Sequence, residues 1–121
     1  MSNRTLLSAE TPGTLQLAAA TQVSAAGIVS RTVLQSPELR VVLFTFAEGQ
    51  ELTTHTSTRR AVIQMLEGHG EFFFDGRWEK LPAGTLLHLP PSQPHAVRAS
   101  AGPFSMLLTL GSEPREPAAA K

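Results

Sequence analysis

The sequence has no cysteine, no tyrosine, no net charge and no long apolar run. Without cysteine, the chain has no disulfide, no thiolate metal ligand and no cysteine nucleophile. Lys plus Arg and Asp plus Glu each total 10 in 121 residues, which argues against a protein that binds nucleic acid or a membrane surface. No apolar stretch reaches the roughly 20 residues that a membrane-spanning helix needs. These absences indicate a soluble globular protein.

The ends of the chain differ from its body. Residues 1–13 are polar, are interrupted by Pro12 and lack the charged and apolar pattern of a signal peptide, so we expect a cytoplasmic protein. The sequence predicts a flexible N-terminus over 1–13, one domain over 14–111 and a disordered tail over 112–121. A short helix is expected near Leu15 to Ala20, where alanines gather.

From Gly27 onward, short apolar or alternating runs are separated by turn residues. These runs cover residues 28–34, 40–46, 61–66, 71–74, 77–81, 85–89 and 104–110. Asp75-Gly76 lies between two of them and is a strong hairpin signal. Many short strands without a long helix predict an all-β sandwich or barrel.

Two histidines lie in segments with regularly placed turn residues. In the first segment, Gly49 is followed by five residues and His55, and Gly68 follows later. In the second segment, Gly84 is followed by five residues, then Pro90, and His95 comes five positions after that proline. Imidazole is the most common protein ligand of metal ions, so two histidines brought together would suggest a metal-binding pocket.

Both segments resemble the two motifs of the cupin superfamily, in particular the small single-domain bacterial cupins. The resemblance spans about residues 28–110 and implies a cupin-type double-stranded β-helix, also called a jelly-roll barrel. Ser57 stands where the first motif has its second histidine, and Ala61 stands where it has glutamate. Ser92 and Ala99 replace a glycine and an asparagine of the second motif.

The resemblance implies one divalent ion, Fe, Mn, Ni or Zn, held by three histidines and a glutamate. Only His55 and His95 of that set are present. Gln64 and His88 are candidate additional ligands. For Gln64 the alternative is a side chain that faces away from Ala61 by strand alternation, and for His88 it is a structural histidine in an apolar strand. The histidine pair itself could instead be hydrogen-bonded residues of a wet barrel.

A small-molecule ligand would contact side chains around this pocket. The predicted contacts are Ser57, Arg59, Arg60, Gln64 and Met65. The two arginines follow His55 in a loop at the expected barrel mouth, where they would attract an anionic ligand; a solvated pair is the alternative.

Two functions follow from this pocket. The first is a non-catalytic small-molecule-binding or sensor module, which we favour because the loss of two ligands weakens an ion site more than it harms a cavity. The second is a metal-dependent enzyme of the dioxygenase or isomerase type that acts on a small organic substrate. In both cases the apolar strand surface and the family resemblance suggest a homodimer.

Overall fold

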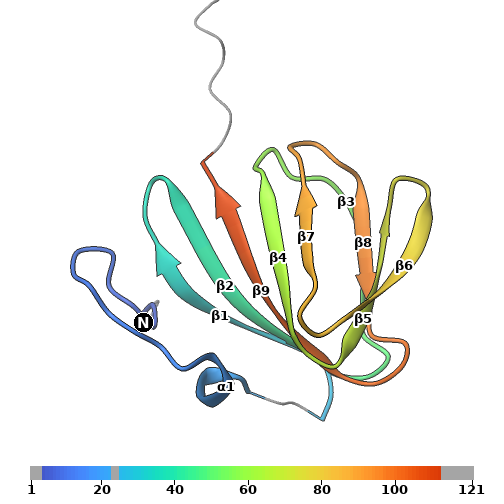
Figure 1. Cartoon of the computed structure of the whole chain (residues 1–121), viewed down its shortest axis with the longest axis horizontal. Coiled ribbons are helices and arrows are strands. Elements are labelled where there is room, and N and C mark those ends of the chain that lie inside the picture. The colour runs from blue at the N-terminus through green and yellow to red at the C-terminus, as the bar shows by residue number, and fades with distance from the viewer. Residues whose placement is uncertain (1–3, 23–24, 113–121) are drawn as a thin grey trace, which may run out of the picture.

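The computed structural model describes residues 4–22 and 25–112, and nearly all of its regular secondary structure is β-strand (Figure 1). One helical turn, α1 (Leu17–Ala20), precedes them. The strands are β1 (Ile28–Gln35), β2 (Leu39–Phe46), β3 (Glu51–His55), β4 (Ala61–Glu67), β5 (His69–Phe74), β6 (Arg77–Pro82), β7 (Leu86–Leu89), β8 (His95–Arg98) and β9 (Phe104–Gly111). The predicted all-β class is therefore confirmed.

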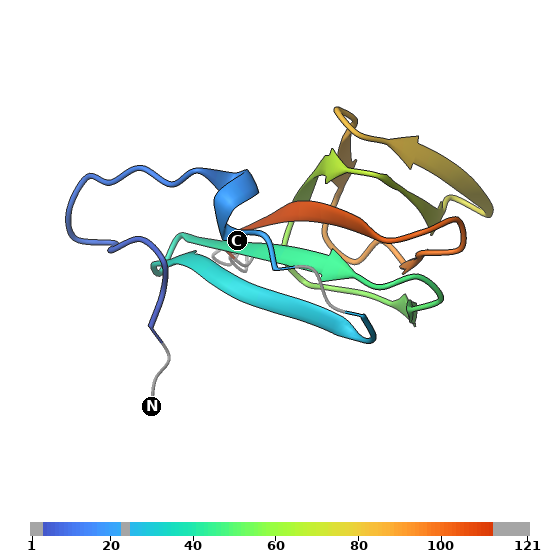
Figure 2. The same ribbon diagram turned by 90° about the horizontal axis from the view of Figure 1, so that it is seen from below.

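The strands form two antiparallel sheets that face each other. One sheet has the order β1-β2-β9-β4-β7, and the other has the order β3-β8-β5-β6. The four-stranded sheet lies over the β4 and β7 side of the five-stranded sheet, whereas β1 and β2 lie at the opposite edge (Figures 1 and 2). This arrangement is the predicted jelly roll, and it leaves β1 and β2 extending beyond the facing sheet.

The main core fills the space between the sheets. Phe46 is fully buried and stacks on Phe104, with ring centroids 4.6 Å apart. Met65 and Phe72 are each 1% exposed and belong to the same cluster. Alternation along each strand directs every second side chain inward, so these residues from both sheets meet in one layer.

A second, smaller core lies on the outer face of β1 and β2. Val33 and Leu43 are buried there, and Leu6 and Leu7 of the N-terminal segment pack against them. The amides of Leu6 and Leu7 donate to the carbonyls of Thr32 and Val33 over 3.1 and 2.8 Å. Leu6 and Leu7 thus lie along β1, while the flexibility expected of residues 1–13 stays a prediction. Residues 1–3, and all of the predicted 112–121 tail except Ser112, lie outside the described residues.

All seven predicted strands are present, and the helix lies within its predicted range. The hairpin at Asp75-Gly76 joins β5 to β6 with φ values of 57° and 87°, as a two-residue turn between twisted strands requires. Two strands, β3 and β8, were not among the seven predicted runs. They are the strands that carry His55 and His95.

Candidate ligand site at the barrel mouth

His55 and His95 lie directly opposite each other on the neighbouring strands β3 and β8. Their ring centroids are 4.3 Å apart and the ring planes are inclined by 59°. Leu52 lies opposite Val97, so three steps along β3 match two steps along β8, with a register shift between Leu52 and His55. A β-bulge of this kind adds one residue and turns His55 to the same face as Leu52. That face is the inner one, because Val97 belongs to the core.

The histidine pair stands at one mouth of the barrel. Phe74 lies opposite His95 on β5, and Ala61 lies between Leu89 and Leu110 on the facing sheet. The end of β3 and the start of β8 are at the same end of the molecule as the start of β4 and the end of β7 (Figure 1). The mouth thus combines two imidazoles with apolar side chains.

The hydrogen bonds of the two rings fix their tautomers. His55 Nδ1 is 2.9 Å from the carbonyl oxygen of Thr53, and His95 Nδ1 is 2.8 Å from that of Gln93. A carbonyl oxygen can only accept, so Nδ1 carries the proton and donates in each case. In the neutral rings both Nε2 atoms therefore keep a free lone pair. Such a pair of nitrogens can accept hydrogen bonds or bind a metal ion.

Burial lowers the pKa of His95 below its ordinary value of 6.5, the hydrogen bond to Gln93 opposes this shift, and the nearby His55 lowers the pKa further. The folded state disfavours the charged ring of His95, so the unfolded chain binds the proton more readily. The free energy of unfolding is therefore unaffected by this ring above pH 6.5 and decreases as the pH falls below that value.

We expect imidazole NMR to place the titration of His95 below 6.5, and we expect His55→Ala to move it upward. An unchanged His95 titration in that variant would show that the two rings do not interact.

The other two metal-ligand positions of the motif do not fit a metal centre. The Ser57 hydroxyl accepts a hydrogen bond from the Arg59 backbone amide over 3.0 Å, and Ala61 is 4% exposed and offers no donor atom. No group of three or more His, Cys, Asp or Glu that could hold an ion occurs within the described part of the chain. A catalytic ion generally requires three protein ligands, so two imidazoles alone do not complete the set.

Gln64 and His88 do not join the histidine pair, which corrects their predicted ligand role. Gln64 is exposed and lies between the buried Ile63 and Met65 on β4, so it faces outward. His88 is opposite Val62 on the same outer face. Arg60 Nη1 donates to His88 Nε2 over 2.8 Å. The alternative given for Gln64, an orientation opposite to Ala61, agrees with the structure.

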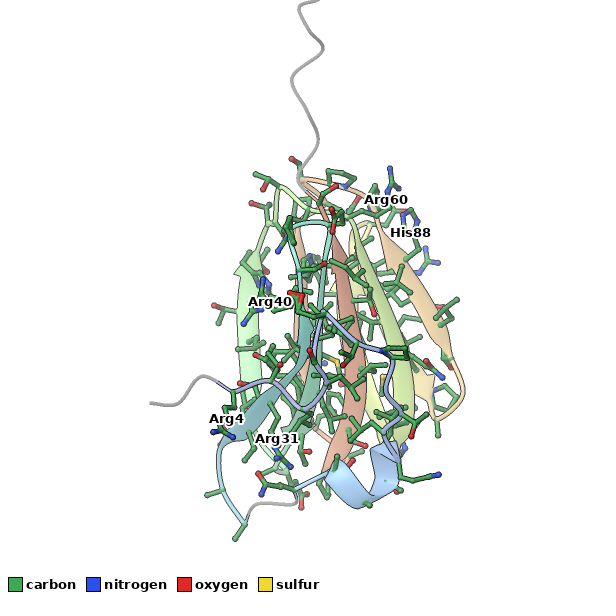
Figure 3. All side chains as sticks on the ribbon, turned by 90° about the vertical axis from the view of Figure 1, so that its left-hand side faces the viewer. Arg4, Arg31, Arg40, Arg60 and His88 are labelled. Atoms are coloured by element: carbon green, nitrogen blue, oxygen red, sulfur yellow. The ribbon has the colours of Figure 1, made fainter. Side chains whose placement is uncertain are left out.

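The remaining predicted ligand contacts are divided between the core and the mouth loop. Met65 is 1% exposed and is part of the core, so the prediction of a ligand contact there is corrected. Arg60 is turned toward His88 on the outer face (Figure 3). Arg59 is half-buried, and its Nε has no acceptor among the described residues.

The loops on either side of the mouth are joined by one short hydrogen bond. The Ser92 amide donates to the Ser57 carbonyl over 2.6 Å, and Ser92 has a φ of 68°. This left-handed conformation explains why the second motif has glycine at that position.

We expect Ser92→Gly to raise the free energy of unfolding by about 0.5–1 kcal/mol, since the backbone amide is kept and the strain of the positive φ is removed. Urea denaturation would measure it, and a loss of stability would contradict it.

Comparisons with known proteins agree with this geometry. A family model described as "Cupin domain" matches residues 42–110. No curated protein matches the sequence. A conserved protein of unknown function from Streptococcus pyogenes has a similar structure, with 26% identity, a TM-score of 0.77, and coverage of 93% of this chain and 97% of the other.

Two further solved structures extend the comparison. An RmlC-like cupin protein from Desulfovibrio desulfuricans is 38% identical, with a TM-score of 0.62 and coverage of 69% of this chain and 81% of the other. A DMSP lyase from Ruegeria pomeroyi shares the fold at 20% identity, with a TM-score of 0.67 and coverage of 74% and 49%. The single helical turn described in the structure is too short to cross a membrane. The motif segments, the jelly-roll topology and the family match together show that this chain belongs to the cupin family.

Proposed function

We propose that the protein is a non-catalytic small-molecule-binding or sensor module that takes its ligand at the mouth beside His55 and His95. The observation that carries this proposal is the composition of the motif positions. Two imidazoles remain, while Ser57 and Ala61 replace the other two ligands, and the Ser57 hydroxyl is engaged within its own loop. The two histidines remain paired although the metal-ligand set is incomplete.

The chemistry of the mouth indicates the kind of ligand. Both Nε2 atoms are acceptors, because each Nδ1 donates to a backbone carbonyl. Phe74 lies opposite His95 in the strand register and supplies apolar surface beside the rings. A ligand with an apolar body and a hydrogen-bond donor, such as an alcohol or a phenol, complements this arrangement.

A pair of matched probes tests this proposal. Phenol and toluene have similar shape, but only phenol donates a hydrogen bond. We expect phenol to perturb the imidazole NMR signals at lower concentration than toluene, and we expect His55→Ala combined with His95→Ala to abolish the difference. Equal responses to the two probes in the parent protein would refute a ligand site based on the Nε2 acceptors.

A metal-dependent enzyme is the second candidate, and one observation favours it. The hydrogen bonds from Nδ1 to backbone carbonyls are of the kind that orients metal-bound histidines. Elemental analysis of protein purified without a polyhistidine tag and supplied with Fe(II), Mn(II), Ni(II) or Zn(II) separates the candidates. Retention of about one ion per chain, lost in the double histidine variant, would favour the enzyme. A metal content near zero would favour the binding module.

A further inference from the structure

A cleft of about 570 Å³ opens beside β1, and its lining residues come from the N-terminal segment, β1 and β2. None of them belongs to β3 or β8, so the cleft is separate from the histidine pair. Its charged lining residues are Arg4, Arg31 and Arg40, and no acidic residue lines it. Three positive charges gathered in one cleft are notable in a chain whose formal net charge is zero.

Arg40 stands at one end of the cleft. It begins β2 together with Leu39, lies opposite Gln35 and alternates with Val42 and Phe44, so it shares their inner face. Its Nε is shielded from solvent and has no acceptor among residues 4–22 and 25–112. A buried donor without a partner is costly, and an anionic ligand that draws the Arg40 guanidinium group into the cleft would supply the missing acceptor.

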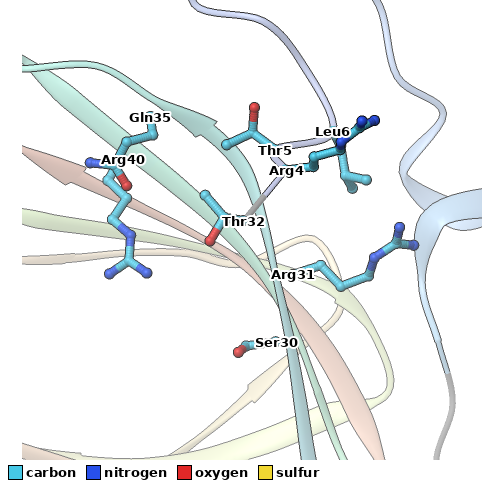
Figure 4. A pocket seen from close by; sticks show the side chains of 8 residues that line it. All are labelled: Arg4, Thr5, Leu6, Ser30, Arg31, Thr32, Gln35 and Arg40. Atoms are coloured by element: carbon cyan, nitrogen blue, oxygen red, sulfur yellow. The ribbon is translucent and has the colours of Figure 1, made fainter. Parts of the chain in front are cut away.

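Arg4 and Arg31 stand at the other end (Figure 4). Arg31 turns toward α1 and donates from Nη1 to the Ala20 carbonyl over 3.1 Å. The amide of Leu6 bonds to β1 and keeps Arg4 beside it. The ion pair found in the described part of the chain joins Arg98 to Glu71 on the other sheet, so no carboxylate pairs with the cleft arginines there.

Hydroxyl and amide groups of β1 also line the cleft. They belong to Ser30, Thr32 and Gln35, and Thr32 lies between Arg31 and Gln35 along the strand. Gln35, the partner of Arg40, comes four positions after Arg31 on β1, which corresponds to about 13 Å along an extended strand. The cleft is therefore long, positive at both ends and polar but uncharged in the middle.

We propose that this cleft binds an elongated small molecule with a carboxylate at each end. A guanidinium group offers a planar fork of donors that matches a carboxylate, and the intervening hydroxyls can bond to polar groups of the ligand. This site is independent of the proposed function of the histidine mouth, because the two share no residue.

Isothermal titration calorimetry at low salt with suberate and octanoate tests the proposal. The two probes have the same chain length, but octanoate has only one carboxylate. We expect suberate to bind at least about tenfold more tightly, as a second charge-assisted contact implies. Arg40→Gln and Arg4→Gln should each reduce suberate affinity to that of octanoate.

Two control variants make the result specific. Arg77→Gln removes an exposed charge from β6 on the other sheet and should leave suberate affinity unchanged. His55→Ala combined with His95→Ala should also leave it unchanged. Arg4 is exposed, so its replacement should not impair folding and gives a test even where Arg40→Gln is unstable. Equal affinity of the parent for the two probes, full affinity in either cleft variant, or an equal loss in Arg77→Gln overturns the proposal.

Discussion

A variant with Ser57→His and Ala61→Glu is expected to bind about one transition-metal ion per chain, whereas the parent binds little. These two positions are the ones at which the motif has metal ligands, and Ala61 faces the barrel interior between Leu89 and Leu110. Together with His55 and His95, the variant would offer three imidazoles and one carboxylate, a set that suits Zn, Fe or Mn. Elemental analysis and calorimetry would measure the gain.

The thermal stability of the same variant provides an independent readout. A glutamate at position 61 replaces a side chain that is 4% exposed, so the metal-free variant should be several kcal/mol less stable than the parent. An ion present at 100 times its dissociation constant restores about 2.7 kcal/mol. The control is the same variant with His95→Ala, which should lose most of the rescue. A variant that unfolds at the same temperature with and without metal would show that the loops no longer bring the four positions together.

Phe46→Ala is expected to lower the free energy of unfolding by about 3–5 kcal/mol, among the largest effects of any single truncation in this chain. The ring of Phe46 is fully buried, stacks on Phe104 at 4.6 Å and contacts the ring of Phe44 at 6.1 Å. Its removal leaves a cavity between the two sheets that neighbouring strands cannot fill. Urea denaturation would show a lower midpoint with an unchanged slope.

Leu86→Ala is the matched control for this truncation. Leu86 is also a large apolar residue on a strand, but it is 67% exposed on the outer face. Its truncation should change the free energy of unfolding by no more than about 0.5 kcal/mol. A similar loss in the two variants would mean that Leu86 is covered in solution, as it would be in a homodimer that uses this face.

The fold was predictable because its strands carry apolar residues and end at turn residues. The hairpin at Asp75-Gly76 and the motif glycines have the positive φ values that their positions require; Gly49 and Gly84, for example, have φ values of 90° and 91°. The ranges of the histidine strands were missed because the two strands are short, and β3 is largely polar. In β3, Leu52 is the only one of five residues that is not exposed.

The orientation of the site residues was only partly predictable. Simple alternation places Gln64 outward, as observed, but it also separates Leu52 from His55 onto opposite faces. The bulge between them brings Leu52 and His55 to the same face, and no residue of Glu51 to His55 signals a bulge.

The arginine cleft was missed because Arg4 is far from Arg31 and Arg40 in the sequence, and residues 1–13 were expected to be flexible. A polar segment with two leucines gave too weak a signal for its contact with β1.

The amides of Leu6 and Leu7 also bond to backbone groups at the edge of the five-stranded sheet. A strand at the edge of a sheet presents free carbonyl groups to which a second chain can add, which is a common first step of aggregation. On β1, the carbonyls of Thr32 and Val33 already accept hydrogen bonds from the N-terminal segment. A shortened chain that begins at residue 14 would uncover this edge and remove one wall of the arginine cleft.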